Sequence, residues 1–289
     1  MKFVKYHALG NDYLVVRPSE LPGEPEPARI RLLCHRHYGV GSDGVLLGPL
    51  ASRTCEFGLR IFNPDGSEAE KSGNGLRIFA RSLWDEGLVA DRPFTVETPG
   101  GAITCRVEST GRSVTVEMGE VSFRSERIPV SGPARDVLDE EMTVHAKTLR
   151  FCAATVGNPH CVVLDDQPSA ETAKRFGPLL ERDARFPNRT NVQFMKVIDR
   201  HNVRIEIWER GAGYTLASGS SSTAAAGVAY RLGLCDAEIT VHMPGGRLQI
   251  QFQDGFHAIM TGPVTKVCEG DVADEMFDED LLAASPGLD

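Results

Sequence analysis

The sequence lacks features that mark several whole classes of protein. No stretch approaches roughly 18 consecutive apolar residues, so we expect no membrane-spanning helix. The N-terminal stretch MKFVKYHALGNDYLVV carries charges within its apolar run, so we expect no signal peptide. The seven cysteines are scattered, odd in number and without a CxxC pair, which argues against a zinc ribbon or a disulfide scaffold and favours the cytoplasm.

Positive charge is also scarce. The chain has 31 Lys and Arg against 40 Asp and Glu, for a net charge of −9. Nucleic acids and anionic membranes both require a basic face, so we expect neither as a main partner. An anionic small molecule remains possible, because a few arginines and helix N-termini suffice to bind one inside an acidic protein.

What the sequence does contain is an internal repeat, whose two copies begin about half a chain length apart. Ser72 opens SGNGLRIFARSLWDEGLVADRPFTVETPGGAITCRV, and Ser218 opens SGSSSTAAAGVAYRLGLCDAEITVHMPGGRLQIQF. Each copy predicts a helix of about four turns that ends at a Gly-Leu pair with the glycine as C-cap. Each continues with a strand, a Pro-Gly-Gly turn and a further strand.

The rest of the sequence alternates strand patterns with a few helices, which predicts an α+β fold in two similar halves, each a sheet wrapped around its long helix. We place the domain limits at 1–120, completed by a strand from about 263–275, and at 121–262, with an acidic tail over 276–289. No low-complexity linker separates the halves, so we expect them to pack face to face around a cleft.

The two Ser-Gly steps are candidate binding features. A helix N-terminus offers unpaired backbone N–H groups and a partial positive charge, and glycine lets a ligand approach the backbone closely. Two such helix starts in a cleft would hold a carboxylate from two sides. The alternative is that Ser72 and Ser218 are ordinary N-caps, which is the usual role of serine at this position. Their matching places in a repeat favour the ligand site.

Further polar motifs have no evident structural role. They are HALGNDY, YGVGSDGVLL, FNPDGSEAE, VGNPHCVV, RTNVQF and WERGAGYT. Any one Asn or Asp among them is more often a turn former than a ligand.

Through these motifs, taken together and in this order, the chain resembles the diaminopimelate epimerase family over nearly its full length. The resemblance implies two pseudo-symmetric α/β barrel-like domains, each enclosing a central helix, with the active site in the cleft between them. It also implies epimerisation at the α-carbon of diaminopimelate without pyridoxal phosphate or a metal, so we expect no cofactor. In the usual family pattern a cysteine heads each central helix, one removing the α-proton and the other returning one.

The resemblance implies a set of site residues by position. The catalytic positions are Ser72, Ser218, His160 and Glu209, with His160 as partner of Ser72 and Glu209 as partner of Ser218. The substrate-binding positions are Asn11, Asn63, Gly73, Asn74, Asn158, Asn191, Arg210, Gly219 and Ser220. The expected partner is a small amino acid, and a homodimer is possible by the same resemblance.

This chain departs from the family pattern where the chemistry should occur. Serines stand at both cysteine positions, and an alcohol is a far weaker acid than a thiol. Tyr214 replaces a glutamate, Lys71 an apolar residue, and Gly44 a glutamine of some members. Changes beyond the two serines favour a natural divergent relative over an engineered inactive one. The positions that recognise the distal end of the substrate match.

Three functions remain open from the sequence. The first is an epimerase-type isomerase in which serines work with His160 and Glu209. The second is one-base proton chemistry, a double-bond isomerase or a dehydratase. The third is an inactive amino-acid-binding relative that keeps the recognition residues without an acid–base pair.

Overall fold

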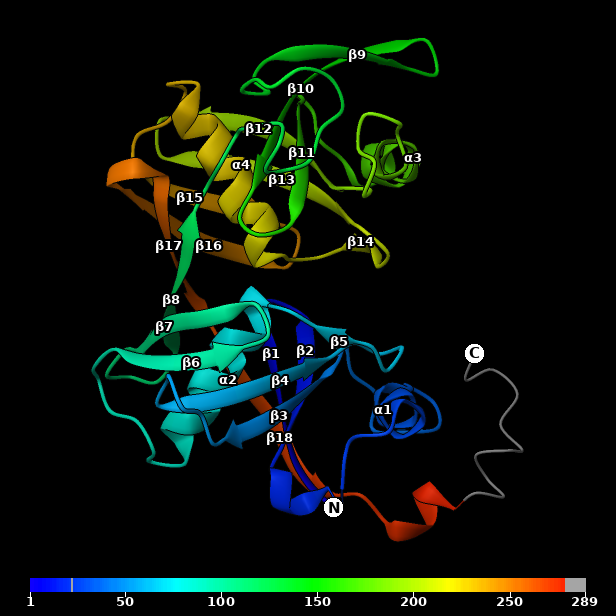
Figure 1. The fold of residues 1–289 in the computed structure, drawn as a ribbon, viewed down its shortest axis with the longest axis vertical. Coiled ribbons are helices and arrows are strands. Elements are labelled where there is room, and N and C mark those ends of the chain that lie inside the picture. Colours follow the sequence, from blue (N-terminus) through cyan, green and yellow to red (C-terminus); the bar gives the residue numbers. More distant parts are fainter. Residues whose placement is uncertain (22, 279–289) are drawn as a thin grey trace. The chain divides into compact units, whose positions relative to one another are not determined.

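The computed structural model describes residues 1–21 and 23–278 (Figure 1). The chain divides into two compact units. The N-terminal unit comprises Met1–Val116 and the segment that starts at Pro263, and the C-terminal unit is Glu117–Gly262. The sequence predicts the first limit at 120, against 116 here, and the return of the chain to the N-terminal unit at about 263. From position 279 on, the predicted acidic tail lies outside the described residues.

The N-terminal unit is a mixed sheet with two helices, α1 (Pro27–Cys34) and α2 (Gly73–Asp85). Neighbouring strands are antiparallel except at β2–β3 and β4–β6, which are parallel. A short strand, β5 (Glu68–Ala69), pairs with β4. The strand order is β18 (Thr265–Asp271), β1 (Lys2–Ala8), β2 (Asn11–Val16), β3 (Val45–Leu50), β4 (Phe57–Phe62), β6 (Phe94–Thr98), β7 (Gly101–Val107) and β8 (Ser113–Glu120).

The C-terminal unit repeats this arrangement with α3 (Ala170–Glu181), α4 (Gly219–Arg231) and a short strand, β14 (Gly213–Thr215), beside β13. Its parallel pairs, β11–β12 and β13–β15, stand where β2–β3 and β4–β6 stand in the other unit. The predicted internal repeat is therefore confirmed at the level of strand order and direction. The order is β9 (Glu140–Val144), β10 (Lys147–Thr155), β11 (Pro159–Leu164), β12 (Asn191–Asp199), β13 (Asn202–Glu209), β15 (Glu238–Met243), β16 (Gly246–Gln253) and β17 (His257–Pro263).

Each sheet wraps around one helix, as predicted. Helix α2 packs against β1, β2, β3 and β7, and α4 packs against β10, β11, β12, β13, β15 and β16 (Figure 1). Nearly all of α4 is buried, and its Gly and Ala residues allow the strands to come close. A Cβ on Gly227 would lie 3.0 Å from the Val121 side chain.

Both central helices end in the same way. Gly87 and Gly233 each have φ of +70°, the left-handed conformation that glycine adopts most easily. The next residue, Leu88 or Leu234, donates its N–H to a carbonyl five residues back, at 2.9 Å and 3.0 Å. This is the Schellman cap, and it confirms the predicted helix ends.

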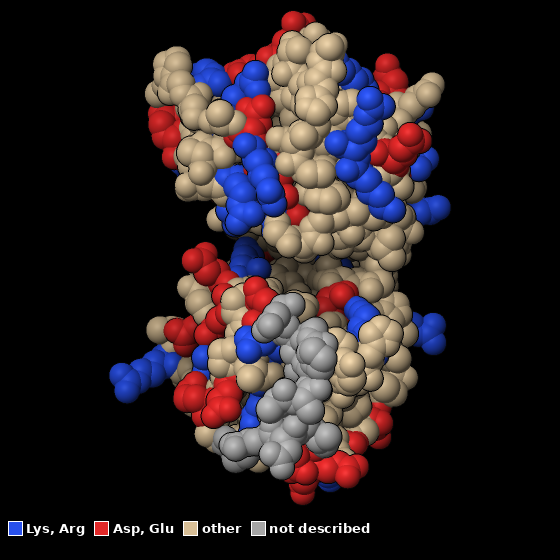
Figure 2. Space-filling model, turned by 90° about the vertical axis from the view of Figure 1, so that its right-hand side faces the viewer, with Lys and Arg blue, Asp and Glu red and all other residues tan. Residues whose placement is uncertain are grey.

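The surface is mixed in charge. On the face of the C-terminal unit that Figure 2 shows, acidic and basic side chains are interspersed. Ion pairs of this unit include Arg135–Glu140 and Arg150–Asp139. Within the described ranges, no helix is long and apolar enough to cross a membrane.

If α2 is the centre of the N-terminal core, shortening its side chains will be costly. Leu76 is fully buried on α2, so Leu76→Ala should lower the free energy of unfolding by about 2–5 kcal/mol. Leu88→Ala, at a leucine that is 45% exposed, should change it by less than about 0.5 kcal/mol. Urea titrations followed by circular dichroism would compare the two, and equal losses would contradict the central placement of α2.

Candidate functional site

Helix α2 begins at Ser72, which is its N-cap in an extended conformation. The Ser72 hydroxyl oxygen accepts the N–H of Gly75 at 3.0 Å. The same oxygen lies 3.2 Å from the hydroxyl of Tyr13 on β2. Ser72 is therefore an N-cap, as the simpler interpretation holds, but it also has a second hydroxyl beside it.

A chain of amides joins the first turn of α2 to the β1–β2 turn. The Asn74 side-chain N–H donates to Asn11 Oδ1 at 2.9 Å, and Asn74 Oδ1 accepts from the Arg77 guanidinium at 2.8 Å. Arg77 is fully buried. Burial lowers its pKa to about 9, still above neutral pH. Two of the predicted binding residues, Asn11 and Asn74, thus touch each other, and a buried cation orients the second.

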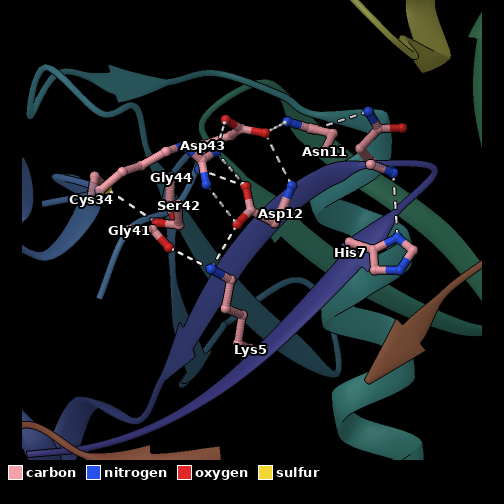
Figure 3. Close-up of polar contacts among 12 residues, drawn as sticks. Lys5, His7, Asn11, Asp12, Cys34, Gly41, Ser42, Asp43 and Gly44 are labelled. Carbon is pink, nitrogen blue, oxygen red and sulfur yellow. Dashed lines mark hydrogen bonds and ion pairs between the residues drawn. The ribbon is translucent and has the colours of Figure 1, made fainter. Parts of the chain in front are cut away.

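Asn11 is held from its other end by an ionic network (Figure 3). Its amide donates to Asp43 at 2.9 Å, and Asp43 pairs with Arg36 at 2.7 Å. Arg36 also pairs with Asp12, which Lys5 contacts at 2.8 Å. Burial acts to raise the pKa of Asp12, but hydrogen bonds from Arg36 and Lys5 outweigh it and lower that pKa to about 2. The side chain of Asn11 is therefore fixed before any ligand arrives.

Helix α4 begins at Ser218 with the same N-cap geometry, and its hydroxyl accepts the N–H of Ser221 at 3.4 Å. The next serine, Ser222, donates its hydroxyl to the Ser218 carbonyl at 2.8 Å, and Thr223 donates to Gly219 at 2.9 Å. Ser221, Ser222 and Thr223 are fully buried. Hydroxyls that return to helix carbonyls fill space at a crowded helix start without leaving buried donors unpaired.

The β10–β11 turn reaches α4 as the β1–β2 turn reaches α2. Asn158 donates to the Ser220 hydroxyl at 3.4 Å, and its carbonyl oxygen lies 2.9 Å from His160 Nε2. The other ring nitrogen, Nδ1, lies 3.2 Å from the Gln193 amide, which also donates to Ser221 at 2.9 Å. An amide N–H facing Nδ1 assigns the ring proton to Nε2, from where it is donated to Asn158.

His160 is held neutral by these surroundings. Burial lowers its pKa to about 3, and the nearby charge of Arg210 acts in the same direction. Both ring nitrogens are engaged inside the C-terminal unit. The catalytic role predicted for His160 stays a prediction, and its contacts favour a role in positioning Asn158 instead.

The third cluster lies where β12 begins and β13 ends. Asn191 is buried, donates to the Pro159 carbonyl at 2.9 Å and accepts the Arg210 N–H at 3.0 Å. The Arg210 side chain is exposed and donates to the Asn188 carbonyl at 3.0 Å. Glu209 is the last residue of β13 and is half-buried. Asn191 therefore bridges the VGNPH turn and the ERGAG turn by hydrogen bonds, so the motifs VGNPHCVV, RTNVQF and WERGAGYT lie together.

Two further predicted features have local explanations. Asn63 follows β4 and donates its amide to the Ser67 hydroxyl at 3.0 Å, within the turn that leads to β5. Tyr214, which stands for a glutamate of the family pattern, donates its hydroxyl to the buried Glu206 at 2.7 Å. Burial raises the pKa of Tyr214 to about 12, and the bond to Glu206 adds to this effect.

Sequence reasoning missed Tyr13 and Gln193. The strand register relates Tyr13 to His160, because each lies two residues after an asparagine that contacts the central helix. The same register relates Gly44 to Asn191. Aligning the two halves beyond the helix starts would have drawn attention to Tyr13. Gln193 lies in the RTNVQF stretch, but only Asn191 of that stretch was predicted as a site residue, and Gln193 is fully buried within β12.

With this geometry in place, comparison with known proteins defines the family. A family model described as diaminopimelate epimerase matches residues 3–124 and 152–267. The chain belongs to the diaminopimelate epimerase family. It is 59% identical to a protein named diaminopimelate epimerase 2 from a species of Nostoc, over 96% of this chain and 97% of that protein.

Solved structures share the fold at low sequence identity. A hydroxyproline epimerase from Agrobacterium vitis, with trans-4-hydroxy-L-proline bound, aligns with a TM-score of 0.69 over 96% of this chain and 92% of its own, at 17% identity. A methylitaconate-delta-isomerase aligns with a TM-score of 0.62 over 93% and 95% of the two chains, at 12% identity. At these identities the likeness establishes the fold alone.

The neutral, buried His160 predicts how stability depends on pH. Its folded pKa of about 3 lies below the unfolded value of about 6.5, so unfolding takes up one proton between these values. The contribution of His160 to the free energy of unfolding is fully present above about pH 6.5. Below that pH it falls by about 1.4 kcal/mol per pH unit. His160→Gln should remove this slope in urea titrations between pH 4.5 and 7. His37→Gln, on an exposed loop, should retain it.

Proposed function

We propose that this chain is a cofactor-independent isomerase that interconverts stereoisomers of diaminopimelate or a similar amino acid. The reaction is removal and return of the proton at the α-carbon. The observation that carries the proposal is the duplicated helix start, in which Ser72 and Ser218 cap two enclosed helices within a family of epimerases. Membership of that family supports an epimerase or racemase type of isomerase.

The helix starts are suited to the charge that such a reaction creates. Removing the α-proton places negative charge on the α-carbon and its carboxylate. Backbone N–H groups at a helix N-terminus stabilise an anion without reorganisation at the moment of reaction. Gly73 and Asn74 on α2, and Gly219 and Ser220 on α4, present the first-turn amides for this purpose.

Recognition of the distal end belongs to Arg210 and the asparagines. Arg210 uses one N–H on the Asn188 carbonyl, which leaves other donors of its planar fork for a substrate carboxylate. Asn11, Asn63, Asn158, Asn191 and Glu209 would orient the distal ammonium and carboxylate. Because Asn11, Asn158 and Asn191 are already bonded on both sides, they are fixed in place before the substrate binds.

A serine hydroxyl is a poor base for removing an α-proton. An alcohol gives essentially no alkoxide near neutral pH without an adjacent proton acceptor. Proton exchange should therefore be slower than with cysteine at both positions. The two serines also differ in their neighbours: a phenol lies beside Ser72, whereas the α4 helix start is joined to the amide of Gln193 and the imidazole of His160.

This asymmetry favours one alternative, a one-base reaction such as a double-bond isomerisation or a dehydration. Such reactions remove a proton from a single face and need no second acid–base group there. An inactive amino-acid-binding relative is the remaining candidate. In each case the ligand is a small amino acid or a related acid, the setting is the cytoplasm, and a homodimer is compatible with the family.

The deciding experiment is α-proton exchange. The purified protein is incubated with LL- and meso-diaminopimelate in D₂O, and the α-proton signal is followed by NMR. We expect slow washout that Ser72→Ala and Ser218→Ala both abolish. Arg210→Ala should weaken binding by about 10–100-fold through loss of a charged hydrogen-bonding pair. Arg175→Ala, at an exposed arginine of α3, is the matched control.

Absence of exchange has a defined meaning as well. Saturable binding that Arg210→Ala removes, without exchange on either stereoisomer, would reject the epimerase in favour of a binding protein or a different reaction. Unsaturated and hydroxylated amino acids would then be tested in the same way.

A further inference from the structure

Tyr13 is placed to act on Ser72. The residue is 7% exposed, and its hydroxyl oxygen lies 3.2 Å from the Ser72 hydroxyl oxygen. Ser72 Oγ already accepts the Gly75 N–H at 3.0 Å. A hydroxyl oxygen has two lone pairs and one proton. If Ser72 donates its proton to Tyr13, its second lone pair is left for a ligand.

Gly44 is what allows this contact. A Cβ on Gly44 would lie 2.6 Å from Cε1 of the Tyr13 ring and 2.5 Å from the Phe62 carbonyl oxygen. Any side chain at position 44 would displace the ring and, with it, the hydroxyl. At the related position in the C-terminal unit the strand carries Asn191, and the residue related to Tyr13 is His160. The tyrosine and the glycine thus form a pair that only the N-terminal unit has.

We propose that Tyr13 is the proton acceptor for Ser72, acting through it as a positioning and relay residue, and that Gly44 provides the space for its ring. This inference rests on the proposed function. It gives the Ser72 helix start the base that an isolated alcohol lacks. A free phenol ionises near pH 10, far below the pH at which an alcohol ionises, so of the two hydroxyls the phenol is the one that loses its proton more readily.

The step balances as follows. The α-carbon–hydrogen bond breaks and leaves its electron pair on the α-carbon, stabilised through the carboxylate at the helix start. Ser72 Oγ receives that proton while its own proton passes to the phenolate of Tyr13, which becomes a phenol. One negative charge moves from Tyr13 to the substrate, and the N-terminus of α2, which Ser72 caps, would stabilise that charge.

The first test is a double-mutant cycle on α-proton exchange. Tyr13→Phe keeps the ring and removes the hydroxyl, and we expect exchange to slow by about 100-fold, as for loss of a general base. In a Ser72→Cys background the thiol needs no acceptor, so Tyr13→Phe should change the rate by no more than about twofold. An equal loss in both backgrounds would show a structural role only, and no loss in either would show no role; either result overturns the proposal.

The pH profile adds a readout that a structural role would not move. With Tyr13 present, the exchange rate should rise with pH until the phenol has titrated. With Tyr13→Phe this rise should disappear. Asp12 precedes Tyr13, Asp43 precedes Gly44 and Lys71 precedes Ser72 in the chain. These charged residues are the same in both proteins, so they do not account for the difference.

If the wild type exchanges no α-proton, the proposed function fails on that substrate, yet the hydroxyl pair can still be judged. The ultraviolet titration of the wild type minus that of Tyr13→Phe isolates the Tyr13 phenol from the other four of the five tyrosines. A Ser72 hydroxyl that donates to the phenolate stabilises it, so Ser72→Ala should move this titration to higher pH. An unmoved midpoint would overturn the inference without reference to activity.

Discussion

The structure depends on how each central helix begins. A helix enclosed by strands can present its backbone to a ligand only at an end, and the N-terminal end carries free N–H groups and partial positive charge. In both units a serine hydroxyl accepts one of these N–H groups, at Gly75 and at Ser221. In each unit, further polar side chains contact the first turn of the helix that this bond caps.

In both units an asparagine side chain contacts the start of the central helix. In each unit an asparagine from the turn before a parallel-paired strand touches the second residue of the helix, Asn11 to Asn74 and Asn158 to Ser220. Each asparagine also has a second hydrogen-bond partner, which is Asp43 for Asn11 and His160 for Asn158. Amides whose oxygen and nitrogen both have partners keep one orientation. The two halves thus use an ion-paired support in one case and a neutral one in the other.

The supports explain why the halves need not perform the same chemistry. In the N-terminal unit a phenol lies beside Ser72, a half-buried lysine whose pKa is lowered by burial precedes it, and two carboxylates paired with cations support Asn11. Around Ser218 they are serine hydroxyls, an amide and a neutral imidazole. A duplicated fold therefore supplies two equivalent capped helix starts with two different sets of polar neighbours.

The sequence by itself determined the repeat, the N-caps at Ser72 and Ser218, and the glycine caps at Gly87 and Gly233. These features are local: each is set by interactions among residues a few positions apart, and each recurs in both halves. Only the tertiary structure decided the neighbours of the serines. Tyr13 and Ser72 are 59 positions apart, and His160 and Gln193 are 33 apart. Such pairs depend on strand register and helix placement, which the packing of the whole core determines.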